Sequence, residues 1–145
     1  MRTDHGRYQL DDDPGRVDRD AVWEFLSTQA YWGRWRTRAQ LESQLGSAWR
    51  VVAGYERDGG ALVAFARAVS DGVALGYLAD LYVLDRARGN GLGTALVRFM
   101  VEDGPGAGFR WMLHTADAHG LYRRFGFTAP DATCLERPGR LPGSG

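Results

Sequence analysis

The chain has 145 residues, of which 44% are hydrophobic and 25% are charged. This length suits one globular domain with its own core, and the composition lies far from that of disordered or membrane-spanning chains. Eighteen basic residues balance eighteen acidic ones. The overall charge therefore gives no general attraction to nucleic acid or anionic lipid, and any anion site must be local.

Cys134 is the only cysteine, which excludes an internal disulfide bond and a metal site built from several cysteines. The first ten residues carry charged and polar side chains where an export signal needs an unbroken apolar run. The longest apolar run, 61–66, is far shorter than the roughly 20 residues that span a bilayer. We therefore expect a cytoplasmic protein that makes no membrane contact.

Two helices are predicted in the first third of the chain. Asp18 is a candidate N-cap for the first, which we expect to end by Gly33. Thr37 and Gln40 have the spacing of a capping box, which predicts that the second helix begins there. The apolar stripes of the two helices consist of Val22, Phe25 and Leu26 and of Leu41, Leu45 and Ala48.

Three strands are predicted next, at 49–56, 61–69 and 75–84. The segments between them, 58–60 and 70–72, are Asp-Gly-Gly and Ser-Asp-Gly, which are typical of hairpins and tight turns. An antiparallel meander is therefore expected in the middle of the chain.

The apolar period changes from that of a strand to that of a helix at Gly91. Gly-Pro-Gly at 104–106 ends this helix, and a strand is predicted at 109–115. Strand, helix and strand then form a right-handed crossover between parallel strands. A short helix around 118–125 and a last strand from Phe127 complete the expected elements. The apolar face of the longer helix consists of Leu92, Ala95, Leu96, Phe99 and Met100.

The segment 88–94, Arg-Gly-Asn-Gly-Leu-Gly-Thr, lies between a predicted strand and a predicted helix. Backbone N–H groups at a helix N-terminus have no internal partner, so they can bind a phosphate, and glycines let the ligand approach. A dinucleotide-binding loop would need glycine at Thr94 or Leu96, and a Walker A loop would need a lysine. A flexible turn in a glycine-rich chain remains the alternative.

Arg88, Gly91 and Gly93 form the pattern R-x-x-G-x-G, which resembles the acyl-CoA pyrophosphate loop of the GNAT N-acetyltransferase superfamily. The segment 118–127 resembles the second signature of that family, a short helix containing A-x-x-x-Y followed by a Gly-Phe pair. The two signatures stand in the family's order, and the resemblance covers roughly 49–127.

The resemblance implies an α/β fold of the α+β kind, with a mixed central sheet of about six or seven strands and about four helices. The chain 1–145 would form a single GNAT domain. The segment 137–145 is rich in proline and glycine, so we expect it to be a flexible tail. An acyl-CoA cleft would lie between two splayed parallel strands, and the strand before the glycine loop would carry a bulge. Asp85 and Thr115 depart from the pattern, since members often have proline and asparagine there.

The resemblance also implies which residues would contact acetyl-CoA. Backbone groups of the strand before the glycine loop would hold pantetheine, and one N–H would stabilise the thioester oxygen. The residues so assigned are Leu81, Tyr82, Val83, Arg88, Gly89, Asn90, Gly91, Leu92, Gly93, Thr94, Ala118 and Tyr122. No metal is expected, because His114, Asp117 and His119 form no closed ligand set.

Tyr122 is the expected donor of a proton to the departing CoA thiolate, because a phenol with an ordinary pKa of about 10 is protonated at neutral pH. A core aromatic with its hydroxyl at the surface is the alternative interpretation. Asp80 is the first candidate for the general base, acting directly or through water. Asp117, His114 and His119 are fallback candidates, and a structural or solvated role is the alternative for each.

Direct transfer from acetyl-CoA to a primary amine is the expected reaction, because no cysteine is placed to form an acyl-enzyme. The acceptor would be a small-molecule amine or a peptide amine. Tyr31 and Trp32 lie in the region that covers the acceptor site in this family, and with Asp80 and His114 they are the substrate-binding candidates. Packing on the core is the alternative for the aromatic pair.

Three other functions remain open from the sequence. They are a transferase that uses a longer acyl-CoA, a non-catalytic acyl-CoA sensor or interaction module, and a structural domain without a ligand. We expect no nucleic-acid partner, and a homodimer is one possible assembly.

Overall fold

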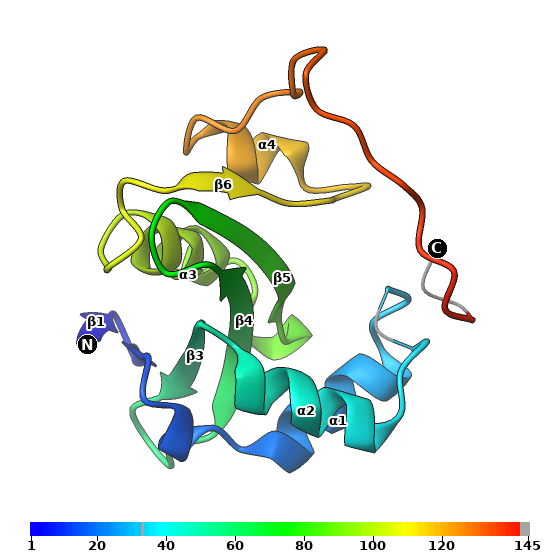
Figure 1. The fold of residues 1–145 in the computed structure, drawn as a ribbon. Helices are drawn as coiled ribbons and strands as arrows, with labels where there is room; N and C mark the ends of the chain where they lie inside the picture. The colour runs from blue at the N-terminus through cyan, green and yellow to red at the C-terminus, as the bar shows by residue number, and fades with distance from the viewer. Residues whose placement is uncertain (33, 143–145) are drawn as a thin grey trace.

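The computed structural model describes residues 1–32 and 34–142. Six strands form one mixed sheet in chain order, with helices on both faces (Figure 1). The strands are β1 (Arg2–His5), β2 (Tyr8–Asp11), β3 (Arg50–Glu56), β4 (Leu62–Ser70), β5 (Leu75–Val83) and β6 (Arg110–Met112). The helices are α1 (Arg19–Thr28), α2 (Arg38–Ser47), α3 (Leu92–Val101) and α4 (His119–Arg123), with short 3-10 turns η1 (Pro14–Arg16) and η2 (Asp85–Ala87).

The predicted mixed architecture is confirmed. Strands β3, β4 and β5 form the expected antiparallel meander, and β6 pairs with β5 in parallel after the crossover through α3. Thr37 and Gln40 form both hydrogen bonds of the predicted capping box, at 3.2 and 2.8 Å. Asp18 caps α1, which ends at Thr28 and therefore before Gly33, as predicted; Gly33 itself lies outside the described residues.

Two segments differ from the expectation. The β1–β2 hairpin is absent from the sequence prediction, because its strands carry charged residues in place of an apolar alternation. The strand predicted from Phe127 is wrong, since no strand follows α4 in the described part of the chain. Pro130, Pro138 and Pro142 cannot donate to a sheet, and the segment around them is exposed. Flexibility of 137–145 stays a prediction, and 143–145 lie outside the described residues.

Two apolar clusters cover the opposite faces of the sheet. Helices α3 and α4 pack on one face, and α1 and α2 pack on the other. On the second face the ring of Phe25 stacks on that of Tyr82, with centroids 3.9 Å apart. Strand β5 is therefore held between two cores. None of the helices in the described residues is long and apolar enough to cross a membrane.

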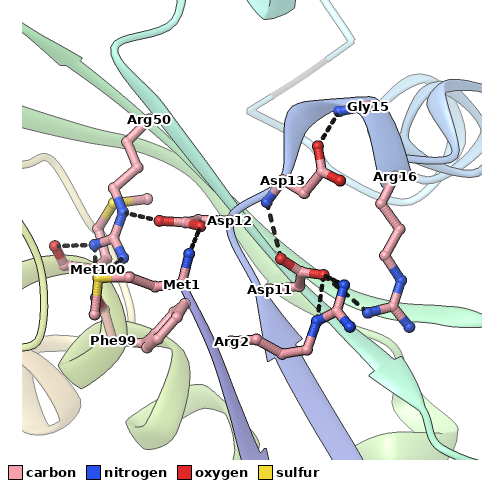
Figure 2. Close-up of polar contacts among 10 residues, drawn as sticks. All are labelled: Met1, Arg2, Asp11, Asp12, Asp13, Gly15, Arg16, Arg50, Phe99 and Met100. Atoms are coloured by element: carbon pink, nitrogen blue, oxygen red, sulfur yellow. Dashed lines mark hydrogen bonds and ion pairs between the residues drawn. The ribbon is translucent and has the colours of Figure 1, made fainter.

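Arg50 on β3 fastens the C-terminal end of α3 to the sheet (Figure 2). Its Nη1 donates to the carbonyl oxygens of Phe99 at 2.6 Å and Met100 at 3.0 Å, and its Nε donates to Asp12 at 3.1 Å. These helix-end carbonyls lack partners within the helix, and a cation is favourable there. Asp12 also accepts from the amino group of Met1. Fixing this end of α3 also sets the direction of its N-terminus, where the glycine loop lies.

Candidate functional site

Strand β5 carries a bulge at Asp80. The pairing of β5 with β4 shifts between Phe65 and Arg67 of β4, which leaves β5 with one extra residue at Asp80 and Leu81. The φ of Asp80 is 55°, and it is the one non-glycine residue with positive φ among the described residues. The bulge implied by the family resemblance is confirmed.

Strands β5 and β6 separate shortly after they begin to pair. Their parallel pairing runs from Leu75 with Arg110 to Tyr77 with Met112. Beyond Tyr77, no strand in the described residues pairs with this side of β5. The second half of β5 therefore has an open edge, as expected for two splayed parallel strands.

The three residues of β5 predicted to hold pantetheine do not all point their backbone N–H and C=O groups to the same side of the strand. Leu84 donates its N–H to the carbonyl of Val63 on β4 at 2.8 Å. Because successive strand residues direct their N–H and C=O groups to opposite sides, the groups of Leu81 and Val83 face the open edge. Those of Tyr82 face β4, and its ring lies in the core. The geometry therefore favours Leu81 and Val83, and turns Tyr82 away from the open edge.

A buried charge cluster lies beneath the bulge. Arg36 donates to Oδ2 of Asp80 at 2.8 Å and to Oδ1 at 2.5 Å, and Nε of Arg67 donates to Oδ2 at 2.9 Å. Burial alone would raise the pKa of Asp80, but the hydrogen bonds and charges of Arg36 and Arg67 outweigh it and hold that pKa below its usual value. A carboxylate with a lowered pKa is a weak proton acceptor. This arrangement argues against Asp80 as the general base and favours a role in holding the bulge.

Sequence reasoning missed both arginine partners of Asp80. Arg36 precedes α2, and its distance from Asp80 along the chain gives no signal. Arg67 is the one charged residue in the apolar run 62–68 of β4, which was a detectable sign of a buried ion pair.

The glycine loop joins β5 to α3 with two glycines in the left-handed region. The φ values of Gly89 and Gly91 are 79° and 70°. Gly91 is the N-cap of α3 and offers no side-chain hydrogen bond, so the first N–H groups of the helix are left for a ligand. Asn90 braces the loop, since its Nδ2 donates to the carbonyls of Ala87 and Arg88 at 3.0 and 3.1 Å. The first turn of α3 consists of the predicted contacts Leu92, Gly93 and Thr94.

Arg88 lies between the end of β5 and the glycine loop. Its Nε donates to the carbonyl of Val83 at 3.3 Å, and its Nη1 lies 3.1 Å from Asp85. The side chain is 64% exposed, so the guanidinium is accessible to an anion bound at the loop.

Tyr122 on α4 is buried against the core, where its ring meets that of Phe127 edge to face. Burial raises the pKa of Tyr122 to about 12, and the negative charge of Asp117 adds to this, so the hydroxyl is protonated at neutral pH. The hydroxyl forms no hydrogen bond with a described residue. Among the described residues, the fully buried side-chain polar atoms without a hydrogen-bond partner are the hydroxyls of Tyr55 and Tyr82. The Tyr122 hydroxyl is not one of them, so it is in contact with solvent.

The N–H of Ala118 donates to Oγ1 of Thr115 at 3.1 Å, and its carbonyl accepts from Leu121 and Tyr122. Thr115 therefore positions the start of α4. The backbone of Ala118 is already engaged within the protein, so a contact with the cofactor would fall to its side chain.

His114 follows β6 and lies between two partners. Its Nδ1 is 2.7 Å from the hydroxyl of Tyr77 on β5, and its Nε2 is 2.8 Å from a carboxylate oxygen of Glu136. The sequence indicated His114 alone, because Glu136 comes from the segment after α4. The fallback candidates Asp117 and His119 are exposed.

The aromatic pair Tyr31 and Trp32 lies just after α1. Tyr31 is 62% exposed and Trp32 is 38% exposed, with their ring centroids 5.3 Å apart. Trp32 also lies 6.4 Å from the ring of Phe25. Trp32 thus lies near the core residue Phe25, whereas Tyr31 is accessible to solvent. The described residues contain no group of three or more His, Cys, Asp or Glu side chains that could hold a metal ion.

Residues 16–127 match the Acetyltransferase (GNAT) family. The chain belongs to the GNAT acetyltransferase family. This GNAT domain is similar to a member of that family from Xanthomonas campestris pv. campestris, with a TM-score of 0.82 and 32% identity over 94% of each chain. Membership supports an acyltransferase.

Two further proteins are similar to this chain, one in fold and one in sequence. A protein from Clostridium acetobutylicum solved with acetyl-CoA has the same fold, with a TM-score of 0.64 and 16% identity over 94% of this GNAT domain and 96% of that chain. A curated relative from Gibberella zeae that bears an acetyltransferase name is 29% identical over 88 residues. That match covers 61% of this chain and 48% of the relative, about half its length.

Proposed function

We propose that this GNAT domain transfers an acetyl group from acetyl-CoA to a primary amine of a small molecule or peptide, in a ternary complex. The observation that carries the proposal is the continuity of the open edge of β5 with the uncapped N-terminus of α3. The edge offers backbone groups to pantetheine, and the helix offers N–H groups to the diphosphate. The acetyl-CoA bound by the relative from Clostridium acetobutylicum supports this choice of donor. A cytoplasmic location stays a prediction.

Two steps of this transfer have a candidate residue on this chain. The N–H of Leu81 faces the open edge and would stabilise the negative charge on the thioester oxygen, an effect worth about 3–4 kcal/mol in comparable sites. The acceptor nitrogen, as a neutral amine, forms a bond to the acetyl carbon, the carbon–sulfur bond breaks, and the thiolate takes the proton of the Tyr122 hydroxyl. The proton that the nitrogen loses on becoming an amide returns through water to the Tyr122 oxygen. The raised pKa of Tyr122 keeps that proton in place until the thiolate departs.

Binding and turnover of acetyl-CoA test the proposal directly. Acetyl-CoA at about 100 times its Kd should stabilise the folded protein by about 2.7 kcal/mol, seen as a rise in Tm. Release of free thiol with a panel of primary amines should then report transfer. A rise in Tm without thiol release from any amine would favour a sensor, and no rise with any CoA species would refute the proposal.

Gly93→Ala should weaken acetyl-CoA binding without harming the fold. A Cβ at Gly93 would lie 3.8 Å from Val83 and 4.0 Å from Leu121, which is ordinary contact, and alanine is the better helix former. The methyl group would project between the end of β5 and α4, where the donor would lie. We expect a loss of about tenfold or more in affinity by calorimetry, with an unchanged or higher Tm.

Gly46→Ala is the matched control for this substitution. Gly46 lies in α2, and a Cβ there would meet nothing within 4 Å. This variant should keep the wild-type affinity. Equal affinities of the Gly93 and Gly46 variants would contradict a donor site at the first turn of α3.

A further inference from the structure

Three side chains from separate parts of the chain form a line of hydrogen bonds where β5 and β6 part. Tyr77 is the last residue of β5 that pairs with β6, His114 follows β6, and Glu136 comes from the segment after α4. The Tyr77 hydroxyl and Nδ1 of His114 are 2.7 Å apart, and Nε2 of His114 and Glu136 are 2.8 Å apart. In Figure 1 the segment after α4 leads along the side of the molecule.

The chemistry of these groups determines which atom donates and which accepts in each hydrogen bond of the line. An ionised carboxylate can only accept, so Nε2 of His114 carries a proton and donates it to Glu136. Nδ1 is then the acceptor for the Tyr77 hydroxyl. Burial raises the pKa of Tyr77, and the negative charge of Glu136 adds to this, so Tyr77 keeps its proton for that bond. The remaining lone pairs of the Tyr77 oxygen can accept a hydrogen bond from a ligand.

The line lies beside the buried cluster beneath the bulge. The charges of Arg67 and Asp80 both act on the Tyr77 hydroxyl, Arg67 lowering and Asp80 raising its pKa. Asp80 binds both Arg67 and Arg36, which precedes α2, so the line shares the face of the sheet that α1 and α2 cover. This is the face on which Tyr31 and Trp32 lie near Phe25. Tyr77 therefore lies where the two strands diverge, on the face of the sheet that carries the aromatic pair.

We propose that Tyr77 and His114, oriented by Glu136, take the proton from the acceptor amine; this rests on the proposed acetyl transfer. An N–H bond of the acceptor ammonium breaks and its proton passes to the Tyr77 oxygen, while the Tyr77 proton passes to Nδ1 of His114. The imidazolium is held by Glu136 and later releases its proton to water. Tyr77 is the catalytic residue of this set, His114 is the final proton acceptor, and Glu136 is a positioning residue.

The need for such a relay depends on the basicity of the acceptor. An amine with a pKa near 10.4 is neutral in only about one molecule in 2,500 at pH 7, whereas an alkoxyamine is already neutral there. A proton acceptor therefore speeds attack by a basic alkylamine far more than attack by an alkoxyamine. This difference separates a proton-transfer role from a merely structural one.

The test compares two acceptors in Tyr77→Phe, His114→Gln and Glu136→Gln. The probes are the primary alkylamine that the wild type acetylates fastest and the alkoxyamine of the same skeleton. With the alkylamine we expect kcat to fall about 10²-fold for the first two variants and about tenfold for Glu136→Gln. With the alkoxyamine each loss should shrink to a few-fold, and acetyl-CoA affinity should be unchanged in all three.

Glu102→Gln is the matched control, because Glu102 pairs with Arg98 on α3 and is half exposed. It should keep wild-type activity with both acceptors. Equal losses with both acceptors, or a loss in His119→Gln that His114→Gln lacks, would overturn the relay while acetyl transfer stands. Absence of thiol release from every amine by folded wild type would overturn transfer and relay together.

Discussion

Tyr122→Phe is expected to lower kcat by about 10²- to 10⁴-fold while leaving the Kd for acetyl-CoA unchanged. The substitution removes the hydroxyl that would protonate the thiolate and keeps the ring that packs against Phe127. Because the pKa of Tyr122 is raised to about 12, wild-type activity should show no loss from its ionisation below about pH 11. Thiol release and calorimetry on the same preparation measure both quantities.

Tyr55→Phe provides the control for loss of a tyrosine hydroxyl. The Tyr55 hydroxyl is buried on β3 without a partner among the described residues, so its removal should preserve or raise stability. Activity should equal that of the wild type. A Tyr122→Phe enzyme with wild-type kcat would show that the thiolate leaves without help from this residue.

The parts of the fold that were predicted correctly have local signals. The capping box of Thr37 and Gln40 and the turns 58–60 and 70–72 act over a few residues, so their sequences suffice. The β1–β2 hairpin lacks such a signal, because β1 is an exposed edge strand. Phe127 misled the prediction, since an apolar residue suits a strand equally well as a side chain that packs beside Tyr122.

In the candidate site, too, the features that could be predicted are those with a local sequence signal. The glycine loop follows from a contiguous motif, and so does the position of Tyr122, although its role remains a prediction. The partners of Asp80 could not be predicted, because Arg36 lies 44 residues away along the chain and Arg67 lies 13 away. The side of β5 to which the N–H and C=O groups of Tyr82 point depends on the register after the bulge. One extra residue in the strand turns these groups to the opposite side.

Asp80→Asn is expected to destabilise the protein by about 3–5 kcal/mol, because it removes the buried carboxylate charge that both Arg36 and Arg67 bind. Asparagine tolerates the φ of 55° as aspartate does, so backbone strain does not explain the loss. Urea unfolding at neutral pH measures it. Adding Arg67→Met should recover part of the loss, since one uncompensated charge is removed with it.

Acidification should remove the stabilisation that the Asp80 carboxylate gives to the wild-type protein. The folded pKa of Asp80 lies below its unfolded value of about 3.9, so the stabilisation is complete above that value and is lost as pH falls through the folded pKa. The difference in unfolding free energy between wild type and Asp80→Asn should therefore narrow below about pH 4. Asp20→Asn breaks an exposed pair with Arg38 and should change stability little at any pH. A difference that stayed constant down to about pH 2 would mean that the Asp80 charge does not hold the two arginines in place.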